Sequence, residues 1–226
     1  MIGIAWILAA VRFLSLPFTP LTDETEARYA EIGRFMAESG NYLTPMLNDA
    51  PFWGKPPLSF WCTAISFKIF GVNDFAAHLP HFLFLMASAV MLYFFVRRWH
   101  GELTGAVAVA ALLIMPAFLY LAGGVMTDPA LAFCTTLCMV SFYDAIFGKE
   151  KFWGYLFFVG LALGLLAKGP ITVVLVGFSI FIWTLLKTAL SKNFVLIFLK
   201  LLFTRSRLLV YRIVCKNYST PPNQLQ

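Results

Sequence analysis

The sequence predicts an all-α polytopic membrane protein. Apolar runs of about 20 residues, the length that a helix needs to cross a bilayer, recur along most of the chain. Hydrophobic residues make up 60% of the sequence and charged residues only 12%, whereas an ordinary soluble domain has about 25% charged residues. The basic residues stand in short clusters between the apolar runs, as is typical of connectors between membrane spans.

The apolar runs give the order of the expected spans. The first run lacks the basic start and the small-residue cleavage site of a signal peptide, so we interpret it as a short spanning helix. Segment 57–70 is apolar but short and contains Lys68, which favours a helix lying at the membrane interface. Spans are expected at 1–18, 76–96, 103–123, 129–147, 152–168 and 170–187, with a weaker run at 194–203.

The basic connectors predict the orientation of the chain. Residues 97–100, 149–151 and 185–192 are short and basic, which places them in the cytoplasm by the positive-inside rule. The acidic segment 19–56 and the turns at 123–128 and 168–170 then face outward. Because topology explains the net charge of +6, no nucleic-acid partner is expected.

The first outward segment is predicted to form a helix on the membrane surface. Thr22 or Asp23 can cap this helix, which extends to about Ser39, and Gly40 can end it. Two pairs of opposite charge lie four residues apart on it, Glu24 with Arg28 and Arg34 with Glu38. Apolar residues share another face, so the helix is amphipathic. They are Tyr29, Ile32, Phe35 and Met36.

Ionisable residues stand at the outward ends of several apolar runs, where a charge is costly unless it reaches water or an opposite charge. Each has a structural alternative: Asp23 and Asp128 can cap helices, and the two lysines can extend to lipid headgroups. Together they suit transfer of a sugar from a phosphate, because lysines bind phosphate and a carboxylate can deprotonate an acceptor. The residues are Asp23 with Glu24 and Glu26, Lys55, Asp128 and Lys168.

Cysteine and histidine spacing shows no metal or disulfide pattern. Cys134 and Cys138 are four residues apart and are expected to pack on one helix face as small apolar residues. His78 and His81 are three apart at the start of a span, where polarity of one helix face is the simpler interpretation. No metal and no cofactor are therefore expected.

Six short motifs follow one another in a specific order. They are "DETEARYAE" (23–31), "SGNYLTP" (39–45), "KPPLSFW" (55–61), "IFG" (69–71), "TDPAL" (127–131) and "AKGP" (167–170). In this order they resemble the membrane glycosyltransferases related to protein O-mannosyltransferases. Within that family they are most similar to the bacterial branch that includes the lipid A 4-amino-4-deoxy-L-arabinose transferase. The resemblance extends from residue 1 to about residue 190.

The resemblance implies a C-type glycosyltransferase transmembrane fold, of which this chain is the N-terminal portion. It implies that Asp23 is the main catalytic carboxylate and that Asp128 is a second acid of the site. Asp23 is separated from Arg28 by one residue more than is typical, so the catalytic position is open between Asp23 and Glu24.

The same resemblance implies that Lys55 binds the donor phosphate and that Lys168 lines the same cavity. Arg28 either assists at the phosphate or forms a salt bridge within the surface helix. Relatives commonly have Glu before the Lys-Pro-Pro motif, where this chain has Gly54, so any role of that Glu is lost or moved.

The expected reaction moves a sugar from a polyprenyl-phosphate donor to a lipid or protein acceptor, with inversion, at the outer face of the bacterial inner membrane. Two alternatives remain, an inactive truncated fragment and a membrane transporter subunit. Transporters place ionisable residues near mid-membrane, whereas here they gather at one face, which favours the enzyme. The expected domain is 1–192, with the outer loop 19–56 and the interfacial helix 57–70, followed by a basic tail, 193–226. The family is longer, so this chain alone is expected to be inactive.

Overall fold

The structure, a computed structural model, describes residues 2–21, 23–48, 50–148 and 150–189, and it confirms the all-α fold class. The weak run at 194–203 and the tail 193–226 lie outside the described residues. The elements are α1 (Ile2–Ser15), the 3-10 helix η1 (Leu16–Phe18), α2 (Glu24–Ser39), β1 (Met46–Leu47), β2 (Ala50–Pro51), α3 (Leu58–Phe70), α4 (Asp74–His100), α5 (Glu102–Ile114), α6 (Pro116–Leu121), α7 (Asp128–Phe147), α8 (Phe152–Lys168) and α9 (Ile171–Ala189).

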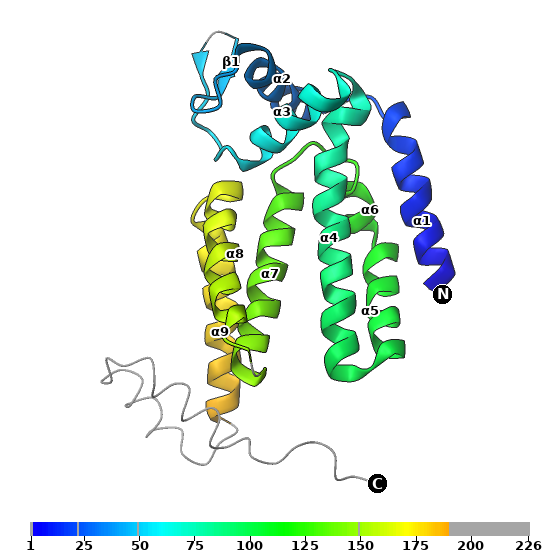
Figure 1. The fold of residues 1–226 in the computed structure, drawn as a ribbon, viewed down its shortest axis with the longest axis vertical. Coiled ribbons are helices and arrows are strands. Elements are labelled where there is room, and N and C mark those ends of the chain that lie inside the picture. Colours follow the sequence, from blue (N-terminus) through cyan, green and yellow to red (C-terminus); the bar gives the residue numbers. More distant parts are fainter. Residues whose placement is uncertain (1, 22, 49, 149, 190–226) are drawn as a thin grey trace, which may run out of the picture.

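The long helices lie side by side, and the first loop covers one end of them (Figure 1). We call this end, with α2, α3 and the antiparallel pair β1–β2, the loop end. The opposite end carries Arg97, Arg98 and Lys151, and we call it the basic end. In the described part of the chain, α4 and α7 are long and apolar enough to cross a membrane, and five shorter helical segments are also apolar.

Three groups of buried side chains hold the described helices together. The first joins α1, α4, α5 and α6, and the second joins α2 and α3 to the start of α4. The third is small and lies between α7 and α8, where glycines permit close approach. A Cβ on Gly160 would lie 2.8 Å from the Cys138 sulfur, so this packing requires glycine. Cys134 and Cys138 are fully buried, which confirms their packing role.

The expected span at 103–123 is wrong as a single helix. It is divided into α5 and α6 at Met115, whose backbone is extended (φ −61°, ψ 125°). The next residue, Pro116, has no N–H and disfavours the helical conformation in the residue before it, which explains the break.

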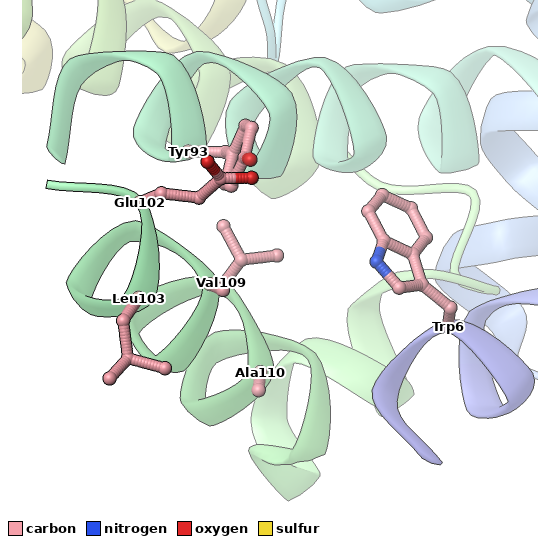
Figure 2. A pocket seen from close by; sticks show the side chains of 7 residues that line it. Trp6, Tyr93, Glu102, Leu103, Val109 and Ala110 are labelled. Carbon is pink, nitrogen blue, oxygen red and sulfur yellow. The ribbon is translucent and has the colours of Figure 1, made fainter. Parts of the chain in front are cut away.

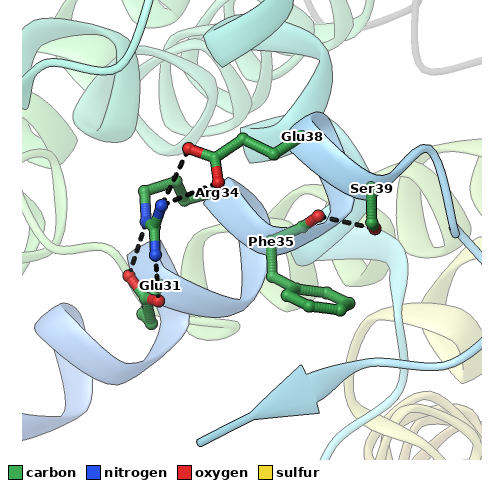
Figure 3. Close-up of polar contacts among 5 residues, drawn as sticks. All are labelled: Glu31, Arg34, Phe35, Glu38 and Ser39. Atoms are coloured by element: carbon green, nitrogen blue, oxygen red, sulfur yellow. Dashed lines mark hydrogen bonds and ion pairs between the residues drawn. The ribbon is translucent and has the colours of Figure 1, made fainter. Parts of the chain in front are cut away.

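The surface helix α2 forms as predicted. The Asp23 side chain accepts a hydrogen bond from the Thr25 amide (2.7 Å), and Gly40 ends the helix with φ of 71°. Arg34 binds both Glu31 and Glu38, so the exposed face carries a three-residue charge network (Figure 3). Arg34 holds the pKa of Glu31 below its ordinary value through this hydrogen bond.

A buried carboxylate at the basic end was not anticipated from the sequence. Asp144 of α7 is 1% exposed, and its Oδ1 accepts a hydrogen bond from Trp99 Nε1 of α4 at 2.8 Å. The Arg98 guanidinium lies 3.8 Å from the same carboxylate and stacks over the rings of Trp99 and Trp153. This cluster fixes α7 and α4 to each other.

Candidate functional site

An ion pair joins α7 and α8 at the loop end. Lys168 Nζ donates a hydrogen bond to Asp128 Oδ1 at 2.5 Å, across 40 residues of sequence. The side chains are 22% and 41% exposed respectively, so both remain within reach of a ligand. The expectation that Asp128 caps α7 is wrong, because Thr127 is the N-cap and Asp128 is already the first residue of the helix. Its carboxylate is therefore free to bind Lys168.

The first loop lies over this ion pair. A Cβ on Gly169 would lie 3.8 Å from the Pro56 ring, so the turn after Lys168 contacts the residue after Lys55. The Tyr29 hydroxyl of α2 is close enough to Asp128 to respond to its charge. Burial raises the pKa of Tyr29 above its ordinary value; Arg28 lowers that pKa, and Asp128 raises it further. Thus α2, the Lys55 segment, α7 and α8 converge at one place.

The three cations predicted for the donor phosphate lie at this end. Lys168 is bound to Asp128, and Lys55 is half-buried beside Pro56. Arg28 forms an ion pair with Glu24 on α2, as the alternative in the sequence analysis had it. Gly54, which replaces the usual Glu, packs tightly: a Cβ there would lie 2.7 Å from the Phe52 ring. The Phe52 ring therefore fills the place where the family's Glu would begin.

Asp23 and Glu24, the two residues proposed for the catalytic position, are both exposed. Asp23 uses Oδ1 to cap α2, which leaves its second oxygen without a partner in the described structure. The Glu24 side chain is 87% exposed and is paired with Arg28. Neither makes a direct contact with the Lys168–Asp128 pair, so their roles in catalysis stay predictions.

Glu26 is the acid of the first loop that turns inward. It is only 8% exposed, and no hydrogen bond or ion pair involves it in the described part of the chain. A Cβ on Gly124 would lie 3.3 Å from its Oε1, so the carboxylate faces the turn that precedes α7. From the sequence, Glu26 was one of three neighbouring acids with Asp23 and Glu24, and no role in the site was predicted for it. Glu26 lies three residues before Tyr29, a residue of the predicted apolar face, and this helical spacing could have predicted that Glu26 faces inward.

A buried histidine connects the elements beneath the site. His81 of α4 lies 3.3 Å (Nε2) from the Thr63 hydroxyl of α3 and close to the backbone of Met126, two residues before Asp128. Thr63 in turn packs against Gly33 of α2. His78, one turn earlier on α4, instead contacts the Thr19 carbonyl at 3.1 Å. His81 is therefore placed to hold the turn that positions Asp128.

The charges of the site suit an anionic ligand. In the described residues, no group of three or more His, Cys, Asp and Glu side chains is arranged to hold a metal ion. The available groups are instead ammonium and guanidinium donors with carboxylates beside them. Such a set can neutralise a phosphate and accept a proton at neighbouring positions.

Comparisons with known proteins identify named relatives of this chain. Two curated relatives are both named undecaprenyl phosphate-alpha-4-amino-4-deoxy-L-arabinose arabinosyl transferase. The protein from Wigglesworthia glossinidia brevipalpis is 30% identical over 178 residues, covering 76% of this chain and 32% of the relative. The protein from Sodalis glossinidius, whose name carries the number 2, is 28% identical over 203 residues, covering 86% of this chain and 36% of the relative. The chain thus spans about a third of the length of these relatives.

Solved structures and a family model give the fold and the family. ArnT from Cupriavidus metallidurans in the apo state matches with a TM-score of 0.74 at 23% identity, over 94% of this chain and 40% of that chain. The same protein bound to undecaprenyl phosphate matches with a TM-score of 0.76 at 24% identity. The model of the dolichyl-phosphate-mannose-protein mannosyltransferases matches residues 10–211. The chain therefore belongs to the dolichyl-phosphate-mannose-protein mannosyltransferase family, and its fold is the helical membrane fold of ArnT.

Proposed function

We propose that this chain forms the donor-binding part of a membrane glycosyltransferase that uses a polyprenyl-phosphate-linked sugar. The Lys168–Asp128 ion pair carries this proposal, because it stays partly exposed at the end that α2 and the Lys55 segment cover. The curated relatives are named for transfer from undecaprenyl phosphate-alpha-4-amino-4-deoxy-L-arabinose, which supports this class of donor.

The proposed reaction is a direct displacement at the sugar. The bond between the anomeric carbon and the phosphate oxygen breaks, and its electron pair leaves with the phosphate. The oxygen of a hydroxyl on a lipid or protein acceptor forms the new bond to that carbon from the opposite side, which inverts its configuration. The acceptor proton passes to a carboxylate of the site.

Lysines carry the electrostatic part of the proposed catalysis. The Lys168 ammonium has three N–H donors, of which one is bound to Asp128, so two remain for phosphate oxygens. Lys55 adds a second positive charge. Arg28 adds a third when it leaves Glu24 and binds the phosphate of the ligand. Charge that develops on the leaving phosphate is stabilised by these fixed cations, and the proposed reaction uses no metal or cofactor.

The carboxylates take the proton in this proposal. Asp128 is held in place by Lys168, and Asp23 retains one oxygen without a partner. The exposed pairing of Glu24 with Arg28 favours Asp23 over Glu24. The buried Glu26 faces the turn before Asp128 and is a further carboxyl group near the site.

The proposed location is the bacterial inner membrane, with the loop end outward and the basic end in the cytoplasm. The positive-inside rule supports this orientation through Arg97, Arg98 and Lys151. A transporter is the weaker proposal. In α4, α5, α7 and α8 the charged residues lie in the first or last turn, away from the mid-membrane depth at which transporters bind their ions.

Donor binding tests the proposal directly. The 226-residue chain would be placed in nanodiscs of neutral lipid, and its affinity for undecaprenyl phosphate compared with that for undecaprenol, which lacks the phosphate. We expect binding that depends on the phosphate and weakens about tenfold in Lys55→Gln, the effect of one charge-assisted contact.

Lys68→Gln is the matched control. Lys68 lies on α3 near the same end, but its ammonium stacks over the Tyr42 ring at 5.2 Å. Its replacement should leave the affinity unchanged. Equal binding of undecaprenol, or an equal loss in both lysine variants, would refute the assignment of Lys55 to the donor.

A further inference from the structure

A cavity of about 580 Å³ lies between α1, α4 and α5, in the half of the molecule nearer the basic end. Figure 2 shows Trp6 of α1 on one side and Tyr93 and Glu102 on the other, with Val109 and Ala110 of α5 between them. The walls are apolar, and Glu102 is the one charged residue that lines the cavity. It is far from the loop-end site and plays no part in the proposed sugar transfer.

Glu102 has unused capacity to accept hydrogen bonds. Its carboxylate lies 3.8 Å from the Arg97 guanidinium, which is beyond the usual hydrogen-bond distance of about 3.2 Å. The two side chains are 72% and 49% exposed, and neither makes a hydrogen bond within the described residues. The cavity mouth therefore carries a long ion pair in which both the carboxylate and the guanidinium retain unused hydrogen-bonding capacity.

Asp144, another acid at the basic end, differs from Glu102 because it is buried and hydrogen-bonded. Asp144 is buried and accepts a hydrogen bond from Trp99 Nε1 at 2.8 Å. No ligand could reach it without unfolding the cluster. Each carboxylate lies 3.8 Å from its arginine, but Glu102 differs in its exposure, in having no hydrogen-bond donor among the described residues and in the open volume beside it.

Arg97 is held at the edge of this cavity. Its guanidinium lies over the Tyr93 ring, 5.9 Å from the centroid, and Tyr93 itself lines the cavity. A cation–π contact of this kind fixes the direction of the arginine but leaves its N–H groups available. Trp6 presents an amphipathic indole, which suits the boundary between lipid tails and headgroups.

The apolar walls, the Arg97 guanidinium and the Glu102 carboxylate together suit a ligand with a hydrocarbon chain, a phosphate and an ammonium group with N–H donors. We propose that this cavity binds a phospholipid with a primary amine, of the phosphatidylethanolamine class, in the leaflet at the basic end. Arg97 binds its phosphate, Glu102 accepts from its ammonium group, and an acyl chain lies along α5 toward Trp6. A headgroup with only negative charge is repelled by Glu102, and a quaternary ammonium has no N–H to donate.

Native mass spectrometry of the 226-residue chain tests this assignment. The chain would be released from micelles that contain equal amounts of dioleoyl phosphatidylethanolamine, phosphatidylcholine and phosphatidylglycerol. We expect phosphatidylethanolamine adducts in about tenfold excess over the other two, the factor for one charge-assisted hydrogen bond. Glu102→Gln should abolish that excess, and Arg97→Gln should lower the retention of all three lipids.

Two further variants separate the cavity from the surface. Glu150→Gln removes another exposed carboxylate of the basic end, outside the cavity, and should retain the full preference. Ala110→Leu fills part of the cavity and should reduce adducts while Glu102 remains. Circular dichroism would verify that each variant is folded. Equal retention of the three lipids, an excess of phosphatidylglycerol, or a preference that survives Glu102→Gln would overturn the proposal.

Discussion

The two ends of α7 each carry an aspartate that faces a basic side chain, and their surroundings differ. At the loop end, the Asp128 side chain is 41% exposed and is paired with Lys168 beneath the first loop. At the basic end, the Asp144 side chain is 2% exposed and lies among Trp99, Arg98 and Trp153. Thus Asp128 belongs to an accessible ion pair, whereas Asp144 on the same helix belongs to a buried structural cluster.

Burial determines what each pair can contribute. A partly exposed ion pair adds about 0–1 kcal/mol to folding, so Asp128 and Lys168 are retained at little benefit to stability. A buried carboxylate with hydrogen-bonded donors is costly to disrupt, because its partners lose their acceptor. Residues that bind ligands are therefore expected at the first pair and residues that hold the bundle at the second.

The largest effect is expected at the closed end. Asp144→Ala should lower the free energy of unfolding by about 2 kcal/mol, since the Trp99 indole N–H would lose its hydrogen-bond acceptor and the partly exposed Arg98 its ion-pair partner. Asp144→Asn, which keeps a carbonyl acceptor, should lose less. Thermal unfolding in detergent would measure both. A change in the free energy of unfolding below about 0.5 kcal/mol, as for an ordinary surface substitution, would show that the cluster does not hold α7 to α4.

The next effect concerns the open end. Asp128→Asn should weaken undecaprenyl phosphate binding about tenfold, because Lys168 loses the charge that positions it. Unfolding should change by less than about 1 kcal/mol, as for other exposed pairs. Isothermal titration in nanodiscs and thermal unfolding of the same preparation would separate the two quantities. A large loss of stability with intact binding would reverse our assignment.

Asp23 distinguishes capping from chemistry within the loop end. Asp23→Ala should destabilise α2 by about 1 kcal/mol, whereas Asp23→Asn should retain the cap. We predict that both substitutions, made in a full-length enzyme that contains this segment, abolish transfer from a radiolabelled polyprenyl-phosphate sugar. Full transfer by the Asn variant would leave Asp23 as a helix cap alone.

A smaller effect is expected from the histidine beneath the site. His81→Ala should weaken donor binding about threefold, by releasing the Met126 turn, and should add nothing to the loss in Asp128→Asn. His78→Ala is the control, since it lies on the same helix but contacts Thr19. Additive losses in the His81 and Asp128 double variant would mean that His81 acts through something other than Asp128.

The smallest effect is expected on the exposed face of α2. Arg34 lowers the pKa of Glu31, so their pairing stabilises the helix above the ordinary glutamate pKa of about 4.3 and this contribution is lost as the pH falls through the lowered value. Arg34→Gln should restore the ordinary pKa at a cost of about 0.5 kcal/mol. A pH titration of the Glu31 carboxyl by NMR would show an unchanged midpoint if the pair is absent in solution.

Local signals predicted much of the fold. Asp23 and Gly40 predicted both ends of α2, and apolar length predicted α4, α7, α8 and α9. The break at Met115 was missed because hydropathy continues through it, although Pro116 was a local signal for it. Asp144 was missed because an acid near the end of an apolar run was not weighed as a buried group.

The site was predicted less completely, because its contacts are distant in sequence. The motifs selected Asp128 and Lys168, but their ion pair depends on α8 returning beside α7. The inward position of Glu26 depends on which face of α2 meets the 123–127 turn. His81 has no local signature at all, since its partners come from α3 and from the turn before α7.

One matched pair of variants tests most directly whether the two ends of α7 differ in role. Lys168→Gln and Arg98→Gln each remove the basic side chain that faces one aspartate of α7. In nanodiscs of neutral lipid, Lys168→Gln should weaken undecaprenyl phosphate binding about tenfold with little change in unfolding temperature. Arg98→Gln should leave binding unchanged and lower the unfolding temperature. An equal loss of binding in both variants, or unchanged binding in Lys168→Gln, would contradict the placement of the donor site at the loop end.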